Sequence, residues 1–216
     1  MRIVFFAFEG LTALDIIGPY EVLSRLPGAQ PVFVAQKRGT VRTDAHAAAF
    51  GFAIDASIDD VKSADMLVVP GGIATRALER DERVLSWLRA VDATTSLTAS
   101  VCTGALLLGA AGILRGKRAT THFAARDRLR KHGAIVVDER VVRDGKYATC
   151  AGVSAGIDLA LTIAIERAGI EVAQAIQLGI EYDPQPPVNA GSDRSAPAHI
   201  VDAVLARIRA RERALE

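Results

Sequence analysis

Short, largely apolar runs of strand-like composition constrain the fold of this chain more than any other feature of its sequence. Four of them cover residues 2–8, 30–36, 64–72 and 95–101, and helix-like stretches follow three of the four. Such runs are typical of strands that are buried on both faces of a parallel sheet, with helices as the crossovers. The sequence therefore predicts an α/β fold, in which helices cover both faces of a mainly parallel sheet.

The rest of the chain adds further helices, edge strands and one long loop. We expect helices at 13–26, 81–93, 103–114, 123–133, 153–169, 171–182 and from about residue 198, strands within 134–152, and a short strand pair at the sheet's edge within 49–58. Gly18-Pro19 weakens the start of the first helix, so its regular part is expected to begin near Pro19. Gly133 is expected to stop the helix before it. Residues 183–197, rich in Pro, Asn, Gly and Ser, are expected to form a loop.

Length and composition favour one large domain, residues 1–216. Half of the 216 residues are hydrophobic, and no internal repeat or linker divides them. The formal net charge is +1, from 26 basic and 25 acidic residues, which argues against binding to nucleic acid or to an anionic membrane. Because the sequence shows no signal-peptide pattern and no apolar run of about 18 residues, we expect a soluble cytoplasmic protein.

The cysteines and histidines show no metal-site pattern. Cys102 and Cys150 form neither a disulfide framework nor a C-x-x-C motif, and no Cys, His or carboxylate group has metal-site spacing. The glycines near residue 71 lack the phosphate-loop and dinucleotide fingerprints. We therefore predict no metal and no cofactor. Cys150 is expected in the core, His122 as a structural or supporting residue of the site, and three histidines on the surface, namely His46, His132 and His199.

Three segments are expected to meet where a ligand would bind. In parallel α/β sheets, ligands lie beyond the carboxyl ends of the strands. This rule gathers residues 9–15 after the first strand, Pro70-Gly71-Gly72 after the third and Cys102-Thr103-Gly104 after the fourth. The side chains and N–H groups of these segments are therefore the candidates for chemistry.

Cys102 and Asp15 each have two interpretations. A thiol between a strand and a helix faces inward-pointing N–H groups and the positive helix terminus, which favour the reactive thiolate. A free cysteine is also a common small core residue, and the local sequence does not separate the two. Asp15 is either a proton carrier beside the thiol, with a raised pKa, or a helix N-cap, which the sequence alone favours.

Gly71, Gly72 and Thr103 have similar pairs of interpretations. Glycines let backbone N–H groups approach a ligand closely, so with the N–H of Thr103 they are candidates for an oxyanion pocket. Pro-Gly-Gly also makes an ordinary strand-terminating turn. The Thr103 hydroxyl is suited to orienting a water molecule or to capping the following helix.

The motifs at these positions, taken in order, resemble those of the DJ-1/PfpI superfamily. They are LDIIGPYEVL (14–23), DMLVVPGG (65–72), ASVCTGALLLGAAGIL (99–114), RATTHF (118–123) and TCAGVSAGIDLAL (149–161). Within the superfamily the chain is most similar to the isonitrile hydratase group, because Asp15 stands where many members carry Glu and Thr103 where other branches often carry His. The resemblance implies a flavodoxin-like three-layer sandwich, a cysteine at a nucleophile elbow and a homodimer with active sites near its interface.

The resemblance also implies an activity, the hydration of a small apolar isonitrile to an N-substituted formamide. Cys102 would be the nucleophile that forms a thioimidate, Asp15 the general acid/base, and Thr103 a group that positions water. Asp183 would reach toward the pocket, while a loop-opening Asp before proline explains this residue equally well. We expect apolar residues to line the pocket, such as Ile16, Ile17, Ile73 and Val153.

Two other functions fit the same residues. One is another enzyme of the superfamily, glyoxalase-like or amidase-like; a Cys-His peptidase is disfavoured because Thr103 occupies the adjacent position. The other is a redox or ligand sensor whose Cys102 is oxidised instead of turning over substrate. The sensor half of AraC-type transcription regulators resembles this core too, but no helix-turn-helix segment follows it in the sequence, which disfavours a regulator.

Overall fold

A seven-stranded sheet forms the centre of the computed structural model, of which we describe residues 1–44 and 50–214. All neighbouring strands are parallel except the pair at one edge, β10 and β11, which is antiparallel. The predicted α/β fold with a mainly parallel sheet is therefore confirmed. In spatial order the strands are β10 (Val141–Asp144), β11 (Tyr147–Cys150), β7 (Leu97–Val101), β6 (Met66–Val69), β1 (Arg2–Phe6), β2 (Gln30–Ala35) and β5 (Ala56–Ser57).

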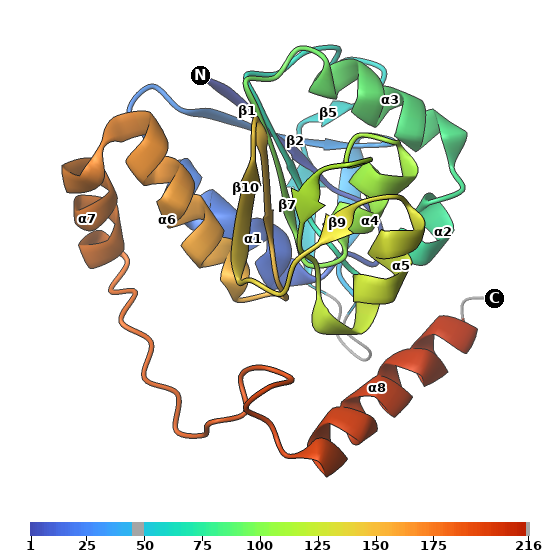
Figure 1. The fold of residues 1–216 in the computed structure, drawn as a ribbon. Coiled ribbons are helices and arrows are strands. Elements are labelled where there is room, and N and C mark those ends of the chain that lie inside the picture. The colour runs from blue at the N-terminus through green and yellow to red at the C-terminus, as the bar shows by residue number, and fades with distance from the viewer. Residues whose placement is uncertain (45–49, 215–216) are drawn as a thin grey trace.

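Helices cover both faces of this sheet (Figure 1). One face carries α1 (Ala13–Leu23) and α6 (Ala155–Ala168), with α7 (Ile170–Gly179) packed beside α6. The other face carries α2 (Thr75–Leu78), α3 (Glu82–Asp92), α4 (Gly104–Ala110), the short 3-10 helix η1 (Phe123–Ala125) and α5 (Arg126–Lys131). No described helix is both long enough and apolar enough to cross a membrane.

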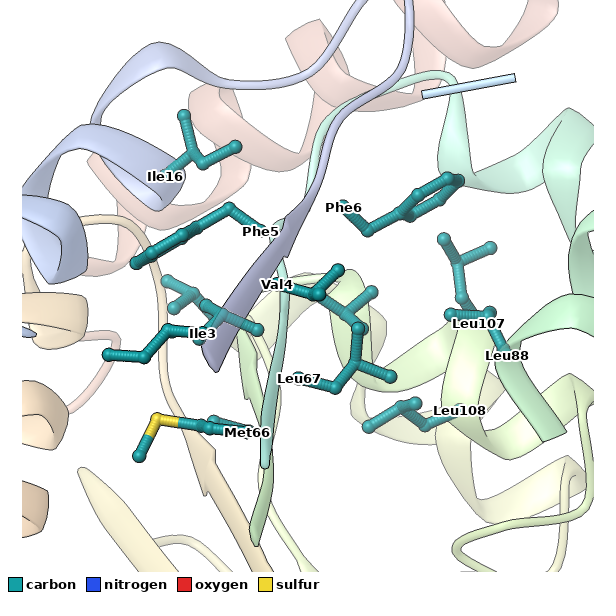
Figure 2. Close-up of a cluster of buried hydrophobic side chains, with 14 of the residues drawn as sticks. Ile3, Val4, Phe5, Phe6, Ile16, Met66, Leu67, Leu88, Leu107 and Leu108 are labelled. Carbon is teal, nitrogen blue, oxygen red and sulfur yellow. The ribbon is translucent and has the colours of Figure 1, made fainter. Parts of the chain in front are cut away.

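The core lies on both sides of β1, which explains why this strand is apolar at successive positions. Phe5 points toward Ile16 of α1, while Phe6 points to the opposite side, toward Leu88 of α3 and Leu107 of α4 (Figure 2). All five side chains are fully buried. Because neither face of β1 meets water, no polar residue alternates with the apolar ones.

The first helix begins earlier than the sequence predicted. α1 starts at Ala13 and holds Pro19 in its interior. The expectation that Gly18-Pro19 delays the helix is wrong, because these residues form the contact between α1 and α6. A Cβ at Gly18 would lie 3.1 Å from the Ile157 side chain, and one at Gly156 would lie 3.1 Å from the Pro19 ring.

Several edge elements also differ from expectation. The predicted strand pair does not pair with itself: β5 joins the main sheet beside β2, while β4 (Gly51–Ile54) pairs with β3 (Gly39–Arg42), which the sequence analysis missed. Residue 49, at the start of that predicted pair, lies outside the described residues. The helix predicted over 123–133 is divided into η1 and α5 and ends before Gly133, whose φ is +85°. Two further short strands, β8 (Arg118–Ala119) and β9 (Ile135–Val136), form a separate pair.

The C-terminal helix is attached differently from the others. After α7, the loop 183–197 leads along the molecule to α8 (Ala198–Arg213) on the side of α2 and α5 (Figure 1). None of the helix's described residues is buried. It is held by ion pairs, Arg76 with Glu212 and Arg211 with Asp44.

Candidate active site

Cys102 lies at a sharp corner between β7 and α4. Its φ is +55°, a conformation that non-glycine residues rarely adopt. The corner is held by the Cys102 N–H, which donates to the carbonyl of Ala151 at 3.0 Å, and by the Thr121 hydroxyl, which donates to the carbonyl of Cys102 at 2.8 Å. Gly104 lets α4 start directly against β6, since a Cβ there would lie 2.1 Å from the carbonyl oxygen of Val69. The predicted strand-to-helix corner is confirmed.

Asp15 is brought to the thiol by the first turn of α1. Its side chain is fully buried, and the Cys102 thiol lies close enough to lower its pKa. Its Oδ2 accepts the N–H of Gly71 at 2.8 Å, and its Oδ1 has no hydrogen-bond partner among the described residues. Thr12 occupies the N-cap position, so the interpretation of Asp15 as a helix cap is wrong.

Burial dominates the ionisation of both groups. It raises the pKa of Asp15 to about 7, with a further contribution from Asp44, while the Gly71 N–H and Cys102 act in the opposite direction. Burial and the Asp15 carboxylate raise the pKa of the Cys102 thiol, against the N–H groups of Val153 and Thr103. The expectation that the corner lowers the thiol pKa is therefore wrong. Two adjacent anions are disfavoured here, so Asp15 loses its proton first while the Cys102 thiol keeps its own.

The two glycines after β6 give their N–H groups to side chains of the site. Gly71 donates to Asp15, and Gly72 donates to Thr103 Oγ1 at 3.0 Å. The Thr103 hydroxyl donates back to the carbonyl of Gly72 at 3.2 Å, and no side-chain cap bond from Thr103 to α4 is found. A Cβ at Gly71 would lie 2.8 Å from Asp15 Oδ2 and 2.5 Å from the Thr103 nitrogen. Glycine is thus required here by packing, and its role in an oxyanion pocket stays a prediction.

Val153 supplies a contact that the sequence analysis missed. Its φ is +36°, which is strained for a β-branched residue, and in this conformation its N–H donates to the Cys102 sulfur. The sequence analysis named Val153 only as an apolar lining residue. Nothing in the local sequence marks this N–H, because the strain is imposed by the fold around residues 151–154.

A pocket of about 310 Å³ adjoins the loop that contains Val153. Its lining includes His122, six residues of the loop segment 190–196, and charged side chains such as Arg126, Asp138 and Arg140. Three apolar residues of α8 complete it, which are Ile200, Val201 and Val204, whereas Cys102 and Asp15 do not line it. Arg126, the first residue of α5, forms an ion pair at 2.7 Å with Asp193, which lies in the loop 183–197. Burial lowers the pKa of His122 to about 4, with Arg76 and Arg126 contributing, and its Nδ1 accepts the Ala124 N–H at 3.3 Å. His122 is therefore a neutral residue beside the site.

Other predicted lining residues lie elsewhere. Ile16 is buried in the core against β1, and neither it, Ile17 nor Ile73 lines the pocket beside Val153. Ile17 instead lines a second pocket between α1 and the end of α7. Asp183 is exposed and accepts a hydrogen bond from the Gln185 side chain at 2.9 Å, as a loop-opening residue would.

The remaining cysteine and histidines follow the predictions with one exception. Cys150 is fully buried and His199 is exposed, as expected. His132 is half-buried, with its Nε2 3.1 Å from Glu79, so its assignment to the open surface is wrong. His46 lies outside the described residues. Within residues 1–44 and 50–214, no three His, Cys, Asp or Glu side chains are grouped as a metal site requires.

Comparison with known proteins identifies the family of this chain. The model of the DJ-1/PfpI family matches residues 1–166. A protein named isonitrile hydratase from Pseudomonas putida is 43% identical over 202 residues, which are 94% of this chain and 87% of that protein. A deglycase from Pyrococcus horikoshii is 29% identical over 69% of this chain and 89% of its own length. The crystal structure of a ThiJ/PfpI family protein from Pseudomonas syringae superposes with a TM-score of 0.93 at 36% identity, covering 98% of this chain and 87% of that one.

Proposed function

Because the chain belongs to the DJ-1/PfpI family, we propose that it is an isonitrile hydratase, a lyase that adds water to R–N≡C and releases an N-substituted formamide. The observation that carries the proposal is the buried Asp15 carboxyl beside the buried Cys102 thiol at the strand–helix corner, where each group acts on the pKa of the other. It provides one nucleophile and one proton carrier, which is all that this hydration requires. The 43% identity to the Pseudomonas putida protein supports the choice of substrate class.

In the first step, the pair adds across the terminal carbon of the isonitrile. The sulfur of Cys102 attacks this carbon while its proton passes through Asp15 to the same carbon. The product is a thioimidate, Cys102–S–CH=N–R, in which no atom or charge has been gained or lost. The N–H groups of Val153 and Thr103 stabilise the negative charge that the sulfur carries before the new bond forms.

In the second step, water hydrolyses the thioimidate. The Thr103 hydroxyl and Asp15 orient the water, and Asp15 takes one proton as oxygen bonds to the carbon. Asp15 passes this proton to the nitrogen. The C–S bond then breaks as the C=O bond forms, and the proton of the added hydroxyl goes to the sulfur. The products are R–NH–CHO and the free thiol. The apolar group R would occupy the pocket between Val153 and the apolar residues of α8.

Formamide production from an alkyl isonitrile tests the proposal. Cys102→Ala should lower turnover to the background rate, whereas Cys150→Ala, which removes the other buried thiol, should retain most of the activity. Formamide is followed by chromatography on a panel of alkyl isonitriles. Turnover by the Cys102→Ala variant would exclude the covalent mechanism.

The rate should also depend on pH through Asp15. Because the pair reacts once it has lost one of its two protons, kcat/KM should rise as the pH passes through about 7. Asp15→Asn should lower kcat by about 10²–10⁴ and remove this rising limb, while the thiol still reacts with alkylating agents. A rising limb that persists in the Asp15→Asn variant would assign the titration to another group.

Two alternatives are separated in the same assays. The likeness to deglycases makes a glyoxalase-like enzyme the second candidate, and turnover of methylglyoxal without turnover of isonitriles would favour it. A redox sensor would form a sulfinate at Cys102 rapidly on exposure to peroxide and turn over neither substrate. A homodimer, which family membership suggests, is also proposed here, and light scattering of the purified chain tests it. The cytoplasmic location expected from the sequence stays a proposal.

A further inference from the structure

Two adjacent residues in the last turn of α8 bind charged residues of two different segments of the chain, Asp44 and Arg76. Arg211 donates to the carbonyl of Asp44 at 2.9 Å and lies 3.4 Å from its carboxylate. Glu212 accepts a hydrogen bond from the Nε of Arg76 at 2.7 Å. The Arg76 side chain is only 13% exposed, so this ion pair is partly shielded from solvent.

From Arg76, a chain of hydrogen bonds leads to the nucleophile. Its Nη1 donates to the Thr75 hydroxyl at 3.0 Å, and that hydroxyl donates to the carbonyl of Gly72 at 2.7 Å. The same carbonyl accepts the hydroxyl of Thr103, which is the neighbour of Cys102 in the sequence. Four hydrogen bonds therefore join Glu212 to Thr103 through Arg76, Thr75 and Gly72.

From Asp44, a second chain leads to the proton carrier. The carboxylate of Asp44 accepts the Thr12 hydroxyl at 3.1 Å, and the Asp44 N–H donates to the carbonyl of Leu11 at 2.9 Å. Thr12 is the N-cap of α1, and its carbonyl accepts the Asp15 N–H at 3.1 Å. Arg211 therefore binds Asp44, and Asp44 in turn holds the start of α1, the helix that carries Asp15.

We propose that Arg211 and Glu212 are positioning residues of the active site, which hold Asp44 and Arg76 where their charges act on Asp15 and Cys102. The inference depends on Asp15 and Cys102 forming the reactive pair and does not depend on which substrate they act on. It also gives α8, whose Val201, Leu205 and Ile208 are half-buried, a role beyond packing against the rest of the chain.

Removing the charge of Arg211 and removing the charge of Glu212 should shift the pKa of the Asp15–Cys102 pair in opposite directions. Two charged groups act on this pair: Asp44 acts on Asp15, and Arg76 acts on Cys102. Two neutral groups lie beside them, the thiol of Cys150 and the imidazole of His122. Without Arg211, the Asp44 carboxylate is less compensated, so the pKa of the pair should rise. Without Glu212, the Arg76 cation is less compensated, so the pKa of the pair should fall.

The rate of Cys102 alkylation by iodoacetamide, measured against pH on the full chain, tests this. Peptide mass spectrometry assigns the modification to Cys102 and separates it from Cys150. At a fixed pH below the thiol pKa, Arg211→Gln should slow alkylation and Glu212→Gln should speed it, each about threefold, which corresponds to a pKa shift of about 0.5 unit. The conservative variants Arg211→Lys and Glu212→Asp should return the rate toward that of the original protein.

Matched controls on the same helix are Arg209→Gln and Asp202→Asn, both exposed residues outside the ion pairs found in the described residues. Both should leave the profile unchanged, and all variants should melt within about 2 °C of the original protein, as expected for a terminal surface helix. Shifts of the same sign in Arg211→Gln and Glu212→Gln, or no shift, would overturn the proposal. Because alkylation needs no isonitrile, this result is independent of whether the chain hydrates isonitriles.

Discussion

The corner at Cys102 and the helix α8 are held in place by different forces. The corner is built from buried groups: Leu106 and Leu107 of α4 are fully buried, and Gly104 lies directly against the backbone of β6. α8 has no buried residue, and ion pairs such as Arg76 with Glu212 attach it to the core. Burying a leucine stabilises a fold by about 1.5–3 kcal/mol, whereas an exposed ion pair contributes about 0–1 kcal/mol.

This difference separates two aspects of the site. The position of the reactive atoms is set by the packed core, so substitutions there should change stability strongly. In our proposal, the charges around Asp15 and Cys102 depend in part on α8, so substitutions there should change reactivity with little effect on stability. The following predictions, from the largest expected effect to the smallest, test this separation.

Gly104→Val should produce the largest loss of stability. Its Cβ would overlap the Val69 carbonyl oxygen, 2.1 Å away, and the backbone of β6 has no room to move. We expect a loss of at least about 4 kcal/mol in the free energy of unfolding, or insoluble expression. Gly179→Ala is the control, because no atom lies within 4 Å of the new Cβ, and it should change stability by a few tenths of a kcal/mol. Equal stability of both variants, measured by urea unfolding, would mean that the corner is not rigid.

Asp15→Asn should change how stability depends on pH. The pKa of Asp15 is raised from 3.8 to about 7, so the folded protein binds a proton more tightly than the unfolded chain between these values. The stability from this proton is present in full below pH 3.8 and is lost as the pH rises to about 7. A shift of about 3 units corresponds to about 4 kcal/mol.

Since Asn does not ionise, the Asp15→Asn variant should gain up to about 4 kcal/mol relative to the original protein between pH 4 and pH 8. Urea unfolding at a series of pH values measures this difference. If the two proteins lost stability in parallel as the pH changes, the pKa of Asp15 would not be raised in the folded protein.

Leu107→Ala and Val204→Ala compare the two regions most directly. Leu107 is fully buried, so its truncation should cost about 2–5 kcal/mol. Val204 of α8 is 39% exposed, and its truncation should cost less than about 0.5 kcal/mol. Because Val204 lines the pocket, the variant should instead raise KM for isonitriles with bulky substituents. Thermal unfolding and steady-state kinetics check both parts, and a large stability loss in Val204→Ala would contradict the separation.

The sequence predicted most elements because burial leaves a signature in composition. The runs that became β1, β6 and β7 are apolar since both of their faces are covered, and the corner at Cys102 follows from a strand that ends where a helix begins. The prediction failed at Gly18-Pro19, where small and rigid residues serve a helix contact that looks like a helix boundary in sequence. It also missed β3, a short strand with only one buried residue.

The site was predicted in part. The sequence placed Cys102, Asp15, Thr103 and the two glycines at one sheet edge, and the structure brings them together. It could not assign the Val153 N–H to the sulfur, because that contact depends on a strained backbone angle. The direction of the thiol pKa was also mispredicted, since the depth of burial is a property of the whole fold.

What the sequence determined by itself is the layering of the protein and the set of residues at its reactive edge, because apolar patterning and strand ends are local properties. Only the tertiary structure decided which groups touch. The proximity of Asp15 to Cys102, the N–H group of Val153 near the sulfur and the ion pairs of α8 bring together residues that are distant in the chain. Their distances depend on how helices and strands pack, and electrostatic interactions depend on distance and burial, which residue identity alone does not specify.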